Sequence, residues 1–253
     1  MKGIHVAFFT EAGYSRGMGH IIRSFAISEK FKYFGIKTSF FLDSNIFFDG
    51  KFKEITYFDW SKFNLSDNYD IIFIDSYEAN IDIYQKISRA CKVAVYIDDF
   101  KRLNYPKGVV LNFSPDSAEI FYNDKEERHH YLLGLKYLPI RSEFVNAKIT
   151  KKEQIFIMLG GSDTASLSLD IVYALKDVII KKTIVSNNLN IVNSLKNHQN
   201  IEVLYKPSDE QLIKTMASSV AAISTASMGA YELAYFKIPT IIVAVAKNQE
   251  IGV

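Results

Sequence analysis

Cysteine, proline and tryptophan are scarce in this 253-residue sequence, which has one cysteine, five prolines and one tryptophan. A single cysteine, Cys91, excludes a disulfide framework and a cysteine-based zinc site, and it fits a reducing cytoplasm, where we expect the protein. Charge of one sign is hardly in excess either. Thirty basic against 28 acidic residues leave a formal net charge of +2, too small to predict nucleic-acid binding.

Long hydrophobic runs are also missing. The apolar stretches at residues 4–9 and 238–246 are strand-length, far short of the roughly 20 residues of a membrane span, so we expect no stable membrane insertion and no signal peptide. Hydrophobic residues nevertheless make up 48% of the chain, which is enough for packed cores. The length then favours one large or two modest globular domains.

Short β-branched and aromatic runs alternate with longer amphipathic stretches, a pattern typical of strands and crossover helices in a parallel sheet. The sequence predicts helices at residues 21–34, 81–90, 165–178, 209–217 and 228–236. It predicts strands at residues 4–9, 38–42, 71–74, 93–97, 109–112, 131–134, 155–159, 183–185, 202–205, 221–224 and 240–245. The predicted class is therefore α/β.

A polar, charged segment at residues 139–152 separates two halves that each open with a strand, a glycine turn and a helix. We place the boundary there and expect two Rossmann-like domains: residues 1–147 for the sugar and the catalysis, and residues 148–253 for the nucleotide. Open parallel sheets bind ligands beyond the carboxyl ends of their strands. The two sheets are therefore expected to face each other across a ligand-binding cleft.

The loop after the first predicted strand ends in Gly17, Met18, Gly19 and His20. Its two glycines let a ligand approach the backbone, and the N–H groups of a helix start favour an anion such as phosphate. Ile22 stands where a dinucleotide fingerprint has its third glycine, which disfavours a nicotinamide cofactor. His20 is then either a general base or a structural histidine that is satisfied by backbone groups.

Two strand-end turns of the second half have the same context. They are Gly160-Gly161-Ser162-Asp163 and Ser224-Thr225-Ala226-Ser227. Each is explained either by helix capping or by a diphosphate cradle built from backbone donors. Glu232, further along the third predicted helix of this half, has the chemistry to accept both hydroxyls of a ribose. The amides of Asn248 and Gln249 follow the last strand, at the same predicted edge.

Acidic and histidine side chains elsewhere do not form a metal pattern. Asp75 and the pair Asp98-Asp99 end neighbouring strands of the first half, where capping or contact with the His20 loop is the favoured interpretation. His129 and His130 are adjacent in a polar stretch and would diverge on a helix or a strand, so a solvated face is favoured there. We expect neither a metal nor a cofactor.

Several motifs occur together along nearly the whole chain. They are Gly17-Met18-Gly19-His20-Ile21-Ile22-Arg23, Ile74-Asp75-Ser76-Tyr77, Asp98-Asp99, Leu111-Asn112, Ile140-Arg141-Ser142-Glu143-Phe144, Met158-Leu159-Gly160-Gly161-Ser162-Asp163, Leu167-Ser168-Leu169, Ile223-Ser224-Thr225-Ala226-Ser227 and Lys247-Asn248-Gln249-Glu250. In this order and spacing they resemble the UDP-2,4-diacetamido-2,4,6-trideoxy-β-L-altropyranose hydrolases of pseudaminic acid biosynthesis. That family is similar to the N-acetylglucosaminyl transferase of cell-wall precursor synthesis.

The resemblance implies a glycosyltransferase-B fold and a UDP-sugar substrate. It implies that His20 activates a water molecule for attack on the anomeric carbon, with Tyr77 and Asn248 as the other catalytic residues. The substrate-binding residues that it implies are Gly17, Gly19, Arg23, Asp75, Gly160, Gly161, Ser162, Asp163, Ser224, Thr225, Ala226, Ser227, Glu232 and Gln249.

The sequence departs from this family at three places. Residues 10–16 replace a serine- or aspartate-rich turn, Ser76 stands where a histidine is common, and the chain ends at Val253, so we expect it to lack a final helix that packs back toward the first domain. Two alternatives stay open: a glycosyltransferase of the same fold that passes the sugar to an acceptor, and a nucleotide-sugar-binding protein with an inactive site. The aromatics Tyr33, Phe34 and residues 47–48 either supply the exposed patch that a lipid acceptor of the transferase needs or pack in the core.

Overall fold

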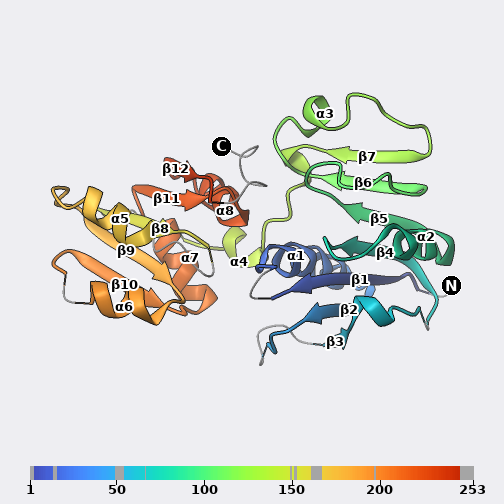
Figure 1. The fold of residues 1–253 in the computed structure, drawn as a ribbon, viewed down its shortest axis with the longest axis horizontal. Coiled ribbons are helices and arrows are strands. Elements are labelled where there is room, and N and C mark those ends of the chain that lie inside the picture. Colours follow the sequence, from blue (N-terminus) through green and yellow to red (C-terminus); the bar gives the residue numbers. More distant parts are fainter. Residues whose placement is uncertain are drawn as a thin grey trace. The chain divides into compact units, whose positions relative to one another are not determined.

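The computed structural model describes residues 3–13, 16–48, 54–65, 67–148, 150, 153–160, 167–196 and 198–245 (Figure 1). The chain divides into two compact units, Met1–Pro139 and Ile140–Val253. Residues 140–147, which we expected in the first domain, pack in the second unit, where the Phe144 ring stacks on Phe236 with 5.4 Å between centroids. The polar segment that follows therefore lies inside the second unit.

The first unit is built on a parallel sheet with the strand order β3-β2-β1-β4-β5-β6-β7 (Figure 1). Its strands are β1 (His5–Ala12), β2 (Lys37–Ser44), β3 (Ile55–Phe58), β4 (Tyr69–Asp75), β5 (Cys91–Ile97), β6 (Gly108–Asn112) and β7 (His129–Leu133). Its helical segments are α1 (Gly19–Tyr33), η1 (Trp60–Lys62), α2 (Ile81–Ala90), α3 (Ser117–Ile120) and η2 (Leu135–Tyr137).

The alternation of side chains along the central strands assigns α1 and α2 to opposite faces of this sheet. On one face, Phe8 of β1 and Phe73 of β4 stack at 4.8 Å and meet Phe31 of α1 edge to face. On the other, Ile72 and Ile74 belong to the core cluster that includes Tyr84 of α2. Both faces are apolar because both are covered, as expected for a parallel sheet.

Strand order reverses direction between β1 and β4, which lie side by side at the centre of the sheet. Chain segments that leave the carboxyl ends of two such strands turn to opposite faces and leave an opening between them, which is the usual ligand position in open α/β sheets. Thr10 pairs with Asp75 at this edge. The His20 loop and Asp75 therefore flank the switch point of the first unit.

The second unit repeats the plan with a parallel sheet of order β10-β9-β8-β11-β12, whose switch point lies between β8 and β11. Its strands are β8 (Gln154–Met158), β9 (Lys181–Ser186), β10 (Ile201–Tyr205), β11 (Ala221–Thr225) and β12 (Thr240–Val243). Its helices are α4 (Ser142–Val145), α5 (Leu167–Ala174), α6 (Leu189–Leu195), α7 (Asp209–Ala217) and α8 (Met228–Tyr235).

Strand β3 and helix α6 were absent from the sequence prediction. β3 is a four-residue edge strand with no fully buried side chain, so it carries no run of core residues. α6 lies in an asparagine-rich stretch that favours a loop. Asn188 instead caps α6, and Ile191 and Leu195 fix the helix by burying one face.

The helices of both units are short. The longest helix in the described ranges, α1, has 15 residues. No helix in those ranges has the length and apolarity needed to cross a bilayer.

Candidate active site

Two glycines shape the loop that leads from β1 to α1. The backbones of Gly13 and Gly17 exchange two hydrogen bonds, of 3.2 and 2.8 Å. A Cβ atom at Gly13 would stand 2.4 Å from the Oδ1 atom of Asn45, and Gly17 has a φ of +74°, a region that side chains disfavour. The loop thus closes on itself and delivers the start of α1 to the edge of the sheet.

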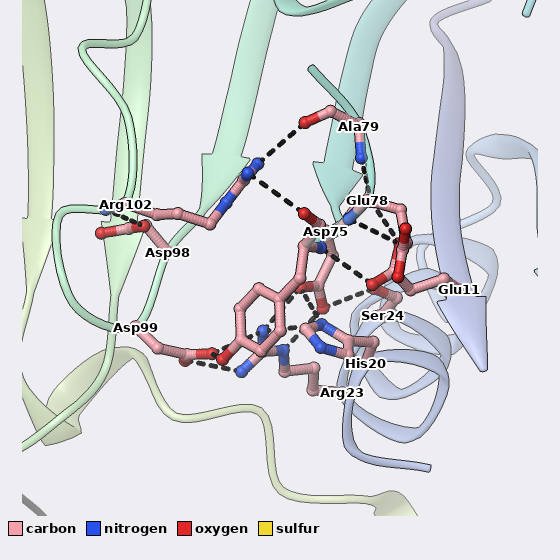
Figure 2. Close-up of polar contacts among 12 residues, drawn as sticks. Glu11, His20, Arg23, Ser24, Asp75, Glu78, Ala79, Asp98, Asp99 and Arg102 are labelled. Atoms are coloured by element: carbon pink, nitrogen blue, oxygen red, sulfur yellow. Dashed lines mark hydrogen bonds and ion pairs between the residues drawn. The ribbon is translucent and has the colours of Figure 1, made fainter. Parts of the chain in front are cut away.

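His20 stands on the first turn of α1 and is buried, with 5% of its surface exposed. Its Nδ1 lies 2.6 Å from Oδ1 of Asp75, the last residue of β4 (Figure 2). A carboxylate only accepts hydrogen bonds, so Nδ1 carries the hydrogen and Nε2 of the neutral ring keeps its lone pair. In the described part of the chain no group hydrogen-bonds Nε2, which therefore has the arrangement of a general base oriented by a carboxylate.

Arg23, one turn further along α1, joins two carboxylates. Its Nε and Nη2 donate to the two oxygens of Asp75 at 2.6 Å each, and its Nη1 and Nη2 donate to Asp99 at 2.7 and 3.0 Å (Figure 2). Such forked pairs fix geometry as well as charge. Nη2 also lies 3.0 Å from Nδ1 of His20, but both nitrogens carry hydrogens there, so this approach is a contact rather than a hydrogen bond.

The charges of this cluster stabilise one another. Burial would raise the pKa of the Asp75 carboxyl, but the charge of Arg23 and the hydrogen bonds from Arg23 and His20 outweigh burial and hold that pKa well below its usual range. Burial would likewise raise the pKa of the Asp99 carboxyl, but the charge of Arg23 outweighs burial and lowers that pKa. Burial opposes the charge of Arg23 itself, while the two aspartates favour it and raise its pKa well above the usual value. Both aspartates are therefore ionised at neutral pH.

Tyr77 forms the open side of the cluster. Its ring meets the imidazole of His20 edge to face, with centroids 4.5 Å apart, and its hydroxyl donates to Oδ2 of Asp99 at 2.5 Å. Burial and the charge of Asp99 raise the pKa of the Tyr77 phenol well above its usual value. Because 37% of Tyr77 is exposed, it is the member of the group that a ligand reaches most directly.

Arg23 and Asp75, which the sequence analysis expected at the substrate, are buried and have protein partners. Arg23 is 6% and Asp75 1% exposed, and Asp75 accepts a further hydrogen bond from Ser24 at 3.2 Å. Both side chains hold His20 and Asp99 in place. Asp98 caps the following turn by accepting from the backbone N–H of Arg102 at 3.0 Å, while Asp99 serves the Arg23 cluster.

Glu11 is a buried site residue that the sequence analysis did not identify. It lies at the end of β1 with none of its surface exposed and accepts from the turn that carries Tyr77. Its position two residues after the predicted strand was a signal, since strand ends of this kind carry site residues.

The strand-end turn of the second unit is only partly accessible. Ser224 and Thr225 are buried, whereas Ala226 and Ser227 are partly exposed. The Thr225 hydroxyl donates to Oγ of Ser227 at 3.2 Å, and Ser227 makes no side-chain cap to α8. Capping therefore does not account for the hydroxyl of Ser227. Its accessible surface suits an anion at the start of α8.

Glu232 of α8 is 4% exposed and paired with Arg141. Arg141 donates from Nε at 2.9 Å and lies with Nη2 at 2.8 Å from the same Oε1 atom. Arg141 also reaches Asp209 at 3.4 Å and lies over the ring of Phe144. A ribose contact of Glu232, as expected from the sequence, would thus be made by a carboxylate whose orientation Arg141 fixes.

Part of the predicted site lies outside the described residues. These positions are Gly161, Ser162, Asp163, Asn248 and Gln249. The described neighbours agree with a glycine turn at the end of β8, where Gly160 has a φ of +85°.

Other histidines and acids do not form a second site. No three His, Cys, Asp or Glu side chains of the described ranges are grouped to hold a metal ion. His129, expected on a solvated face, is half-buried, and its Nε2 lies 3.0 and 2.9 Å from the carbonyl oxygens of Tyr105 and Pro106. His130 beside it is exposed.

Two parallel sheets with central switch points and helices on their faces define a glycosyltransferase-B fold. Similar solved structures agree. The MurG of Acinetobacter baumannii matches 98% of this chain and 81% of its own with a TM-score of 0.61 and 13% identity. CalG4, the calicheamicin glycosyltransferase, matches 96% of this chain and 80% of its own with a TM-score of 0.61 and 11% identity. The predicted fold class is confirmed.

The resemblance expected from the motifs is also confirmed. The chain is 26% identical over 98% of its length to a Helicobacter pylori protein described as pseudaminic acid cytidylyltransferase and UDP-2,4-diacetamido-2,4,6-trideoxy-β-L-altropyranose hydrolase. It spans about half the length of the curated relatives that it matches, 46% in this case. No protein-family model matches the chain.

Proposed function

We propose that this protein hydrolyses a UDP-linked amino sugar to UDP and the free sugar. The observation that carries the proposal is the 2.6 Å contact between Nδ1 of His20 and Asp75, which leaves Nε2 to accept a proton. The name of the Helicobacter pylori relative supplies the substrate class, a UDP-linked diacetamido sugar. The predicted domain roles, sugar and chemistry in the first and nucleotide in the second, belong to the same proposal.

In this reaction a water molecule attacks the anomeric carbon. Nε2 of His20 takes a proton from the water as the new C–O bond forms, and the bond from the anomeric carbon to the diphosphate breaks with its electron pair leaving on UDP. Asp75 keeps the hydrogen on Nδ1 and stabilises the imidazolium, the role of the acid in other carboxylate–histidine pairs. No metal or cofactor takes part in the proposed step.

The surroundings of the reacting atoms follow from exposure. Tyr77 is the accessible neighbour of His20, so we assign it a contact with the sugar. Gly17 and Gly19 support an approach to the start of α1, since no described atom lies within 4 Å of a Cβ built at either position. Ala226, Ser227 and Glu232 of the second unit are assigned to the nucleotide, together with the turn that begins at Gly160.

The test is UDP release from UDP-2,4-diacetamido-2,4,6-trideoxy-β-L-altropyranose without any acceptor. His20→Asn is the sharpest variant, because an asparagine amide can still donate to Asp75 but offers nothing at the Nε2 position. We expect it to lower kcat by about 10²–10⁴-fold, the usual contribution of a general base. His130→Asn, an exposed histidine of the same unit, is the matched control and should keep the parent rate. A His20→Asn rate within a few-fold of the parent would contradict the role.

A second candidate is a glycosyltransferase that passes the sugar to an acceptor, because CalG4, which shares the fold, is a glycosyltransferase. An exposed aromatic patch for a lipid acceptor is not continuous here. Tyr33 and Phe34 are 79% and 67% exposed at the end of α1, and Phe47 is 84% exposed beyond the carboxyl end of β2. Since α1 runs back across the sheet, Tyr33 and Phe34 lie toward the amino ends of the strands and Phe47 lies toward their carboxyl ends. Sugar transfer that requires an added acceptor would favour this candidate.

A further inference from the structure

One buried carboxylate, that of Glu11, accepts hydrogen bonds from the turn that follows β4. This turn comprises residues 76–79 and carries Tyr77 at its accessible side. Glu11, from the end of β1, lies under it with none of its surface exposed (Figure 2). A buried carboxylate is costly unless its oxygens are fully hydrogen-bonded, so the donors around Glu11 are the first question.

Four donors converge on the two oxygens of Glu11. Oε1 accepts from the backbone N–H of Tyr77 at 2.8 Å. Oε2 accepts from the Ser76 hydroxyl, from Nε1 of Trp60 at 3.1 Å and from the backbone N–H of Glu78 at 3.4 Å. Three of these groups are N–H groups that can only donate, and the Ser76 hydroxyl donates here as well, so a side chain that accepts at both oxygens matches them.

The carbonyl oxygens of the same turn have a different partner. Arg102, which follows β5, donates to the carbonyl oxygens of Tyr77 at 3.2 Å and Ala79 at 3.1 Å (Figure 2). The Tyr77 N–H thus goes to the Glu11 carboxylate, the Glu78 N–H is shared between Glu11 and the Ser76 hydroxyl oxygen at 3.0 Å, and the carbonyl oxygens of Tyr77 and Ala79 accept from the guanidinium. The turn is held between two charges of opposite sign, which defines the path of its backbone at Tyr77.

This arrangement locates the Tyr77 ring. Its backbone N–H is fixed by Glu11, its hydroxyl by Asp99, and its ring lies against His20 with centroids 4.5 Å apart. A change at Glu11 alters only the first of these contacts directly. The ring position then depends on a carboxylate that does not itself touch His20.

We propose that Glu11 is a positioning residue that sets the place of Tyr77 beside His20, and with it the sugar side of the site. The proposal rests on the proposed function for its catalytic consequence. Its structural consequence stands by itself: without an acceptor at both Glu11 oxygens, the turn at residues 76–79 loosens and the Tyr77 ring leaves the imidazole.

The test compares Glu11→Gln, Glu11→Asp and the parent. A glutamine sets one N–H against the converging donors in either orientation of its amide, whereas an aspartate keeps two acceptors on a side chain one methylene shorter. Glu29→Gln, an exposed position on α1 that pairs with Lys32, is the matched control. NMR measures amide exchange at Tyr77 and Glu78 and the NOE contacts between the Tyr77 and His20 rings, and steady-state kinetics measures kcat and KM.

For Glu11→Gln we expect amide protection at Tyr77 and Glu78 to fall about 10–100-fold, the worth of a hydrogen bond to a charged group, with loss of the ring NOEs. We expect kcat to fall about 10–100-fold, as for a misplaced site group, with a smaller change in KM. Glu11→Asp should recover part of both, and Glu29→Gln should match the parent. The indole N–H resonance of Trp60, the only tryptophan, should move in both Glu11 variants.

Parent-like exchange, ring NOEs and kcat in Glu11→Gln would overturn the proposal. So would a uniform loss of protection across the first unit with the ring NOEs retained, because this is the signature of a merely structural residue. If Glu11→Gln does not fold, Glu11→Asp decides: parent-like protection and kcat overturn the proposal, and an intermediate loss of both supports it. If the parent releases no UDP, the proposed function fails, and the exchange and NOE results still decide the role of Glu11.

Discussion

The strand ends of the two units carry different kinds of residue, although both sheets have the same plan. In the first, the side chains at the carboxyl ends of β4 and β5 are charged and joined through Arg23 of α1, with Asp75 buried and Asp99 partly exposed. In the second, the turn beyond β11 presents small residues and a hydroxyl, with Ala226 and Ser227 partly exposed.

We propose that this difference separates catalysis in the first unit from nucleotide binding in the second. A base must be held in one orientation and one tautomer, which favours a buried, fully hydrogen-bonded cluster around His20. A diphosphate needs accessible N–H groups and no competing negative charge, which favours the turn before α8. Glu232 is the intermediate case, because it is a buried carboxylate of the second unit that pairs with Arg141.

The largest expected effect comes from breaking the first unit's cluster at its centre. Asp75→Asn leaves Arg23 short of one charge and lets an amide face Nδ1 of His20, which favours the wrong tautomer. We expect kcat to fall about 10³–10⁴-fold. We also expect the free energy of unfolding to fall by about 3–5 kcal/mol, because a buried ion pair loses one partner.

Steady-state kinetics and urea unfolding measure the two effects of Asp75→Asn. The control is Asp70→Asn, at the other end of the same strand, where the side chain is partly exposed and pairs with Lys92. A kcat within about ten-fold of the parent in Asp75→Asn would show that the carboxylate does not orient the base.

Acid should weaken the first unit, and this effect is intermediate in size. Asp75 and Asp99 have pKa values below the ordinary range in the folded protein, so their contribution is complete above the unfolded value of about 4 and is lost as the pH falls through the folded values. Trp60 lies in the first unit and reports its unfolding. The urea midpoint of Trp60 fluorescence should fall between about pH 5 and pH 3.

The variant Asp99→Asn sharpens this expectation. It removes one of the two carboxylates, so its urea midpoint should fall less steeply with acid than that of the parent. A midpoint that stays constant or rises as the pH falls would contradict the proposed balance of charges.

The smallest expected effect lies in the second unit. Glu232→Gln removes the charge that Arg141 orients and weakens any acceptor for ribose hydroxyls. We expect the Kd for UDP to rise roughly 10-fold, at the lower end for hydrogen bonds to charged groups, with kcat changed less than KM. Calorimetry with UDP measures the change, and Glu210→Gln on the exposed start of α7 is its control. Unchanged UDP affinity in Glu232→Gln would remove Glu232 from the nucleotide site.

Much of the fold could be predicted from the sequence because both sheets are parallel and buried. Their strands are apolar runs of strand length, as at residues 71–74 within β4, and the glycine turns mark where helices begin. The local sequence pattern did not predict the elements that bury few side chains. The edge strand β3 has no buried side chain, and α6 begins in an asparagine-rich stretch that resembles a loop.

The sequence predicted the edge of the sheet at which the candidate site lies, but not the contacts among its residues. The rule that parallel strands share a carboxyl edge brought His20, Asp75 and Asp99 to the same side. The strand order β1-β4-β5 was not encoded locally, and it decides that one guanidinium on α1 spans two aspartates. For the same reason the sequence showed neither the aspartate partners of Arg23 nor the contacts of Glu11, which it placed in the turn at residues 10–16.

Hydrolysis of the UDP-sugar in water enriched in ¹⁸O tests the central claim most directly, because it locates the bond that breaks. Attack of a His20-activated water on the anomeric carbon predicts UDP without ¹⁸O and ¹⁸O in the free sugar, with the release of both products lost in His20→Asn. Label in the diphosphate of UDP, or sugar release that survives in His20→Asn, would contradict the account.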